Sequence, residues 1–98
     1  MARYDVYQGS DDILLLDVQA DLLDQLKTRI VVPLILRDKA PQPAQRLNPI
    51  FKIGENYYVM VTQFMASIET TELKSLITNI SHERDTIISA LDMIMQGF

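Results

Sequence analysis

The amino-acid sequence predicts a β-rich protein with one C-terminal α-helix, a small SH3-like barrel or sheet on which the helix packs. Three observations lead to this fold class. Short runs rich in β-branched, leucine and aromatic residues recur up to residue 71, turn residues separate them, and a helical apolar pattern occupies only the segment from residue 80 onwards. The 98 residues suffice for one domain, 1–98, and are too few for a second core.

The chain begins with a predicted hairpin. Residues 4–8 alternate aromatic or β-branched residues with polar ones, residues 9–12 have turn composition, and residues 13–18 are almost entirely apolar. Such an apolar run is typical of a strand covered on both faces, so residues 13–18 are expected inside the sheet. Residues 20–27 contain three leucines, which fits either two turns of helix or a loop that displays leucines.

The middle of the chain predicts a bent strand and then an exposed connection. Residues 29–36 are strongly β-forming by composition, but Pro33 has no N–H to donate. That position is therefore expected at an edge or a bulge. Residues 37–48 contain two prolines and little apolar content, which indicates an exposed connecting segment.

A second hairpin is predicted from residue 49 onwards. Residues 49–53 and 57–64 are apolar or aromatic, and they flank the turn residues Gly54-Glu55-Asn56. The glycine is expected to adopt a positive φ in that turn. Residues 66–71 form a weaker predicted strand, so the sheet has five or six strands.

The C-terminal segment has the pattern of one amphipathic helix. Apolar residues recur at spacings of three, four and seven, as expected for a helix face that packs on a sheet. These apolar residues are Ile80, Ile87, Ile88, Leu91, Ile94, Met95 and Phe98, and the polar residues on the opposite face are Asp85, Ser89, Asp92 and Gln96. Ser81 is the expected N-cap, and Gly97 the expected C-terminal cap.

The composition excludes several kinds of site. The chain has no cysteine and one histidine, His82, so we expect no disulfide, no thiol nucleophile, no metal site and no cofactor. The three glycines are isolated, so no glycine-rich phosphate-binding motif is present. The net charge of −4 has the wrong sign for a protein that neutralises phosphates, and direct nucleic-acid binding is not expected.

The charge is nevertheless distributed unevenly. Residues 1–26 carry six acids and one base, residues 27–52 carry six bases and one acid, and residues 53–98 carry six acids and two bases. The middle block can be a solvated patch, a docking surface for an acidic partner segment, or part of a ribonuclease site. In the last case Arg29, with the Thr28 hydroxyl beside it, would stabilise charge on a phosphate.

Two further features have alternative interpretations. His82 has the position of a surface residue at a helix start, and that interpretation is favoured over a catalytic base. Leu22 and Leu23 lie among polar residues, so at least one is expected in a contact surface, although an irregular loop that buries both is an equal alternative.

The chain is predicted to be cytoplasmic and free of membrane contact. Its first ten residues are polar and contain turn residues, unlike a secretory signal. The longest apolar run, residues 30–36, is interrupted by Pro33 and is far too short to span a bilayer.

Four blocks of the sequence resemble the CcdB family of toxins from toxin–antitoxin modules. They are Asp17–Asp24, Arg29–Leu34, Met65–Ile68 and Ile80–Phe98, in the family's order. The resemblance runs nearly end to end and has least support in residues 37–48. It implies a CcdB/MazF-type fold and a homodimer whose C-terminal helices lie near the two-fold axis.

The resemblance also implies a function by binding. Members of the family are not enzymes; they bind the GyrA subunit of DNA gyrase and trap the cleaved DNA complex, and a CcdA-like antitoxin neutralises them through a disordered tail. The residues that match the family's gyrase-binding surface are Leu22, Leu23, Asp92, Gln96, Gly97 and Phe98. The basic block 27–52 is assigned to capture of the acidic antitoxin tail.

Two alternatives accompany this interpretation. A MazF-like endoribonuclease would use Arg29 and Thr28, although the glycine-rich stretch that precedes the arginine in those enzymes is missing. A non-toxic chromosomal relative is the second alternative, because Gln96 stands where the best-known family ending has tryptophan. A glutamine has no π face for a cation–π contact with an arginine, a contact that is worth roughly 0.5–2 kcal/mol.

Overall fold

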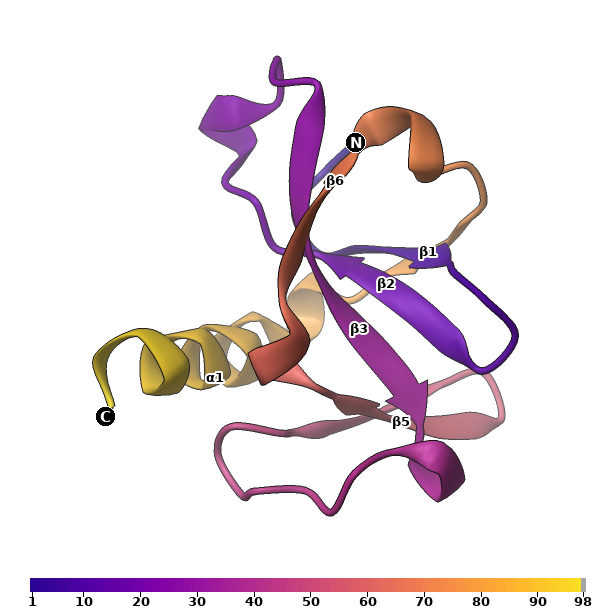
Figure 1. The fold of residues 1–98 in the computed structure, drawn as a ribbon, viewed down its shortest axis with the longest axis vertical. Helices are drawn as coiled ribbons and strands as arrows, with labels where there is room; N and C mark the ends of the chain where they lie inside the picture. The colour runs from indigo at the N-terminus through magenta and orange to yellow at the C-terminus, as the bar shows by residue number, and fades with distance from the viewer. Residues whose placement is uncertain (98) are drawn as a thin grey trace.

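The computed structural model describes residues 1–97, and its main feature is an antiparallel sheet curled into a half-barrel with one C-terminal helix (Figure 1). This architecture confirms the predicted fold class. The strands are β1 (Asp5–Gln8), β2 (Ile13–Asp17), β3 (Thr28–Leu36), β4 (Ile50–Ile53), β5 (Asn56–Met60), β6 (Ala66–Glu69) and β7 (Leu76–Asn79), and the helix is α1 (Arg84–Gln96). Short 3₁₀ helices are η1 (Asp21–Leu23), η2 (Arg37–Lys39), η3 (Thr62–Phe64), η4 (Thr70–Glu72) and η5 (Ser81–Glu83).

The strand order is β4-β5-β3-β2-β1-β7, with β6 paired to β3 outside this path. β2 lies between β1 and β3, so its apolar run is inside the sheet, as predicted. β3 is the centre of the fold because it pairs with β2 along one side and with both β6 and β5 along the other. The later strands β5 and β6 are therefore positioned by the middle of the chain.

Pro33 lies within β3. On the side of β3 away from β2, the paired strand changes from β6 to β5 near this residue. β6 pairs with Thr28–Val31 and β5 pairs with Leu34–Leu36, which leaves residues 32 and 33 between the two partners. The Pro33 carbonyl accepts a hydrogen bond from the Val61 N–H at 3.0 Å. The sequence predicted an edge or a bulge, and the structure instead places the missing N–H at a gap in the ladder of an internal strand.

The second hairpin is tighter than predicted. Ile53 pairs with Asn56, so the turn contains two residues rather than three, and Gly54 has the expected positive φ of 63°. β5 ends at Met60, where the sequence predicted a strand as far as Phe64. The backbone there turns into η3, which packs beside α1.

The sequence did not predict β7. This edge strand pairs with β1, with a bulge at Ile77, and its Leu76 and Ile77 side chains are exposed. Because both apolar residues face solvent, no alternation of apolar and polar residues marks the segment as a strand. Pairing with a strand from the other end of the chain decides its conformation.

The start of the C-terminal helix also differs from the prediction. Ser81 was the expected N-cap, but residues 81–83 form the 3₁₀ turn η5 and α1 begins at Arg84. The Ser81 N–H is a donor here, to Asn79 Oδ1 at 2.9 Å. Asn79 thus supplies the side-chain acceptor at this helix entry.

The predicted apolar stripe of α1 is half confirmed. Ile87 and Ala90 are fully buried, and together with Ile80 they complete a core that also contains Val6, Leu16 and other residues of the strands. Ile94 and Met95 are 36% and 70% exposed, because the last turns extend beyond the sheet (Figure 1). The cap at Gly97 is confirmed, with φ 80° and an N–H that donates to the Met93 carbonyl at 3.0 Å.

The connection between β3 and β4 is largely exposed, as predicted, but Asn48 is a buried anchor within it. Its Nδ2 donates to the Met60 carbonyl at 3.0 Å, and its Oδ1 accepts from the Ala44 N–H at 2.9 Å. Those bonds fasten the end of the connection to β5. Within the described part of the chain, no helix has the length and apolar character to cross a membrane.

Replacement of Ile87 by alanine should lower the free energy of unfolding by about 2–5 kcal/mol, because it leaves a cavity between helix and sheet. The exposed Met95→Ala should change it by less than about 0.5 kcal/mol. Urea denaturation of both variants measures the difference. Equal effects would contradict the packing described for α1.

Candidate partner-binding surfaces

The first candidate surface is the loop that follows β2. Leu22 and Leu23 lie on η1, and their side chains are 95% and 50% exposed. The helix of two turns that was one possibility for residues 20–27 is not formed. The alternative in which both leucines are buried is wrong, and the loop displays them to solvent.

The second candidate surface is the C-terminal end of α1. Asp92 is half-buried, Gln96 is exposed, and Gly97 turns the chain in the left-handed conformation. Phe98, the remaining residue predicted for this surface, lies outside the described residues. The polar face predicted for the helix is thus present at positions 92 and 96.

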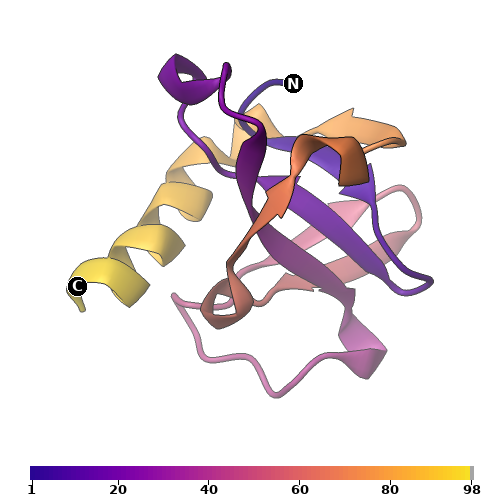
Figure 2. The ribbon, with the colours of Figure 1, turned by 45° about the horizontal axis from the view of Figure 1, so that its top comes forward.

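The backbones of these two surfaces lie apart within a single copy of the chain. In Figures 1 and 2 the η1 loop and the C-terminal end of α1 lie on the same side of the molecule but apart from each other. The sequence had combined Leu22 and Leu23 with residues 92–98 in a single surface. A partner that contacts both must therefore span the face between them or contact two copies of the chain.

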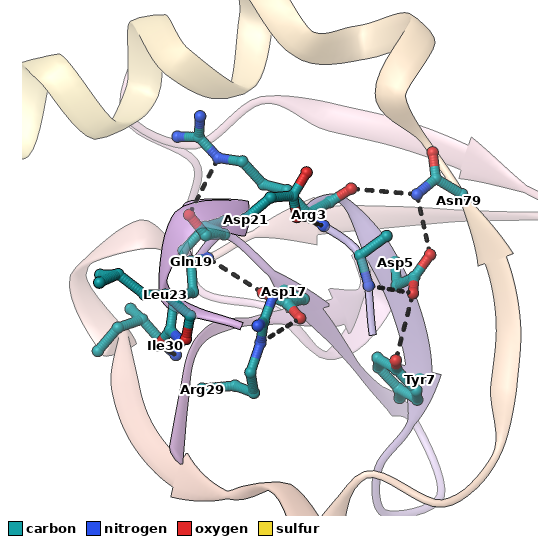
Figure 3. Close-up of polar contacts among 12 residues, drawn as sticks. Arg3, Asp5, Tyr7, Asp17, Gln19, Asp21, Leu23, Arg29, Ile30 and Asn79 are labelled. Atoms are coloured by element: carbon teal, nitrogen blue, oxygen red, sulfur yellow. Dashed lines mark hydrogen bonds and ion pairs between the residues drawn. The ribbon is translucent and has the colours of Figure 1, made fainter. Parts of the chain in front are cut away.

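A buried ion pair lies beneath the η1 loop. Arg29 Nε donates to Asp17 Oδ2 at 2.7 Å, and both side chains are fully buried (Figure 3). Burial raises the pKa of Asp17, and the hydrogen bonds from Arg29 and from the Gln19 N–H oppose that increase. The pair joins the end of β2 to the start of β3, on either side of the segment that contains η1.

Further polar contacts hold the first residues of the chain against this region. The Arg3 N–H donates to Asp21 Oδ1 at 2.8 Å, and Arg3 Nε donates to the Val18 carbonyl at 3.1 Å. The Asn79 amide donates to Asp5 Oδ1 at 2.9 Å. The η1 loop is therefore bounded by the N-terminal segment as well as by β2 and β3 (Figure 3).

The position of Arg29 corrects two sequence-based interpretations. A fully buried guanidinium paired with Asp17 is not available to a phosphate from solvent, so the geometry does not support the ribonuclease site of Arg29 and Thr28. The basic block 27–52 is also not one surface patch. Arg46 donates to Ser89 Oγ at 2.6 Å beside α1, whereas Arg37 and Lys52 lie against the Tyr57 ring, at 4.7 and 5.9 Å from its centroid.

His82 lies on the surface at η5, as the favoured interpretation predicted. Across residues 1–97, no three histidine, cysteine, aspartate or glutamate side chains come together as a metal site would require.

Gln19 and Arg3, whose contacts support the η1 loop, were not predicted from the sequence. One signal was available: Asp17 closes an otherwise apolar run predicted inside the sheet, and Arg29 begins the next predicted strand. A buried carboxylate requires a partner, and a nearby arginine is the commonest one. The residues that contact this pair were not evident from spacing.

Comparison with known protein families identifies the family to which this chain belongs. The profile of the CcdB family (CcdB protein) matches residues 3–97, nearly the whole chain. The chain belongs to the CcdB family. This CcdB-family protein is accordingly a toxin of a toxin–antitoxin system, and the resemblance of the four sequence blocks is confirmed.

The raised pKa of Tyr7 predicts a loss of stability at high pH. Burial, the Asp5 carboxylate and the hydrogen bond to Asp5 raise the pKa of Tyr7 from 10.0 to about 12. Between these values the unfolded chain releases a proton that the folded chain keeps, so the free energy of unfolding falls as pH rises. The slope attributable to Tyr7 approaches about 1.4 kcal/mol per pH unit.

Urea denaturation of the unchanged chain and of Tyr7→Phe, at several pH values above 9, measures this slope. The variant lacks the titrating hydroxyl and should lose less stability over that range. Identical slopes for the two proteins would show that the phenol of Tyr7 titrates normally.

Proposed function

We propose that this CcdB-family protein binds GyrA and traps the cleaved DNA complex of gyrase, acting by binding and not by catalysis. The observation that carries the proposal is the exposure of Leu22, with Leu23 beside it, on a loop supported by buried polar contacts. An apolar side chain held out from an anchored loop is typical of a protein contact. These residues coincide with the family's gyrase-binding positions.

Each proposed contact residue has a chemical role in binding. Leu22 and Leu23 provide apolar area, and full burial of one leucine is worth about 1.5–3 kcal/mol. Gln96 offers an amide donor and acceptor, and the Asp92 carboxylate can pair with an arginine of the target. Phe98 follows Gly97 and is proposed as the final apolar contact.

We infer that the toxin acts as a homodimer. Ile94 and Met95 continue the apolar stripe of α1 beyond the sheet, and Phe64 of the adjacent η3 is 53% exposed. Pairing of these side chains across a two-fold axis would remove them from water. It would also bring two copies of the helix end, including Asp92 and Gln96, onto one face opposite a two-fold target.

The proposed antitoxin is CcdA-like. The toxin surface proposed for its acidic tail is smaller than the basic block 27–52 that the sequence predicted. Of the basic block, Arg37 and Lys52 lie beside Tyr57, and Arg37 and Tyr57 line a small depression that also contains Asp38 and Glu55. Arg37, Lys52 and Tyr57 offer two cations and an aromatic face to an acidic segment that contains apolar residues. Arg29 takes no part, because it is buried.

A gyrase cleavage assay tests the main proposal. With plasmid and ATP, the protein should cause linear DNA to accumulate, and Leu22→Glu should need at least about tenfold more protein for the same effect, because it removes apolar burial of roughly 1.5–3 kcal/mol. Leu26→Glu is the control: Leu26 is also half-exposed after the same loop but lies outside the proposed contact. Normal supercoiling at a large excess of protein would favour the non-toxic relative that Gln96 suggests.

Sedimentation equilibrium tests the dimer. At micromolar concentration the mass should be about twice the 11.2 kDa of the chain, and Ile94→Lys should restore the monomer mass because it places a charge in the apolar interface. Thr86→Lys adds the same charge at an exposed position near the start of α1 and should leave the dimer intact. A monomer mass for the unchanged chain would contradict the proposed assembly.

A further inference from the structure

Gln19 is a buried residue between the end of β2 and η1, and each polar group of its side chain has a partner. Its Nε2 donates to the Leu23 carbonyl at 2.8 Å, and its Oε1 accepts from the Ile30 N–H at 3.1 Å. Since one partner is an acceptor and the other a donor, the two bonds define the orientation of the amide. The side chain therefore links the leucine-bearing turn directly to β3 (Figure 3).

The backbone of Gln19 is held by the buried ion pair. Its N–H donates to Asp17 Oδ1 at 3.0 Å, while the other oxygen of that carboxylate accepts from Arg29. Among the described residues the two terminal nitrogens of Arg29 have no hydrogen-bond partner. The guanidinium therefore contacts Asp17 through Nε alone. A continuous series of contacts thus runs from Arg29 through Asp17 and Gln19 to Leu23.

η1 has little means of holding its own shape. It is a three-residue 3₁₀ turn with no buried residue and no side-chain N-cap. Its internal backbone bonds are the donations from Leu23 to Ala20 at 2.9 Å and from Asp24 to Asp21 at 3.1 Å. Turns this short do not persist without outside contacts, because each bond orders several dihedral angles.

We propose that Gln19 is a positioning residue, which holds Leu22 and Leu23 in the conformation that a partner contacts. The statement that this conformation serves a partner rests on the proposed function. The restraint that Gln19 places on the loop does not. A loop ordered before binding does not lose conformational entropy when the partner docks, so the contacts of Gln19 act on affinity without touching the partner. Arg3 restrains the other side of the turn through Asp21.

Gln19→Glu separates this role from packing. The carboxylate keeps the volume and an acceptor for the Ile30 N–H, but it replaces the donor to Leu23 with a second acceptor that faces a carbonyl. Gln19→Met is a second variant, which keeps the size of the side chain and loses both bonds. Ile87→Val is the matched control, because it weakens the core and Ile87 makes none of the hydrogen bonds that hold η1.

Hydrogen exchange measured by NMR is the first readout. In Gln19→Glu, the Asp24 and Leu26 amides should exchange about tenfold faster, whereas the Val18 amide, bonded to the Ile30 carbonyl, should be unchanged relative to the Ile87→Val control. Unchanged exchange at the Asp24 and Leu26 amides in both Gln19→Glu and Gln19→Met would overturn the proposal. This readout needs no gyrase, so it stands independently of the proposed function.

Binding to purified GyrA is the second readout. We expect about tenfold weaker binding for Gln19→Glu and no comparable change for Ile87→Val. The melting temperature of Gln19→Glu should change little compared with its affinity. If Leu22→Glu weakens binding but Gln19→Glu does not, the positioning role is wrong while the toxin function stands. If the unchanged chain does not bind GyrA, the proposed function fails and hydrogen exchange alone decides the role of Gln19.

Discussion

The buried ion pair between Asp17 and Arg29 is the contact on which the rest of the structure depends. Two charges removed from water are tolerated when they are paired, and removal of one partner from such a pair typically costs about 3–5 kcal/mol. The pair closes the junction between β2 and β3, the central antiparallel pairing of the sheet. It also supplies the acceptor for Gln19 and thereby determines where the following loop begins.

The buried pair also distinguishes charges that hold the fold together from charges that remain on the surface. Arg29 and Asp17 pair inside the sheet, whereas the surface carries apolar residues on η1, a mixed polar and apolar helix end, and Arg37 and Lys52 beside Tyr57. Each group is suited to contact with another macromolecule. A toxin that acts by binding needs such surfaces held rigidly on a small frame, because ordering them during association would weaken the complex.

The candidate surfaces were predictable to the extent that their residues are locally unusual. Adjacent leucines among polar residues indicated that at least one of Leu22 and Leu23 could be exposed, with burial of both as an equal alternative, and the helical period placed Asp92 and Gln96 on a polar face. The role of the basic block was not predictable, because its members point to different places: Arg29 inward, Arg46 toward α1 and Arg37 toward Tyr57. Sequence proximity does not report side-chain direction in a curled sheet.

The sequence alone determined the fold class, both hairpins, the C-terminal helix and its glycine cap, because these depend on periodicity and turn chemistry within a few residues. Tertiary structure alone decided three features: β7 as an edge strand, Asn79 at the entry of the helix, and the contacts from Arg29 to the η1 loop. Each of these depends on contacts between separate segments: β7 pairs with β1, Asn79 is bonded to Arg3 and Asp5, and Arg29 of β3 is paired with Asp17 of β2. Local patterns carry no information about such partners until the sheet has formed.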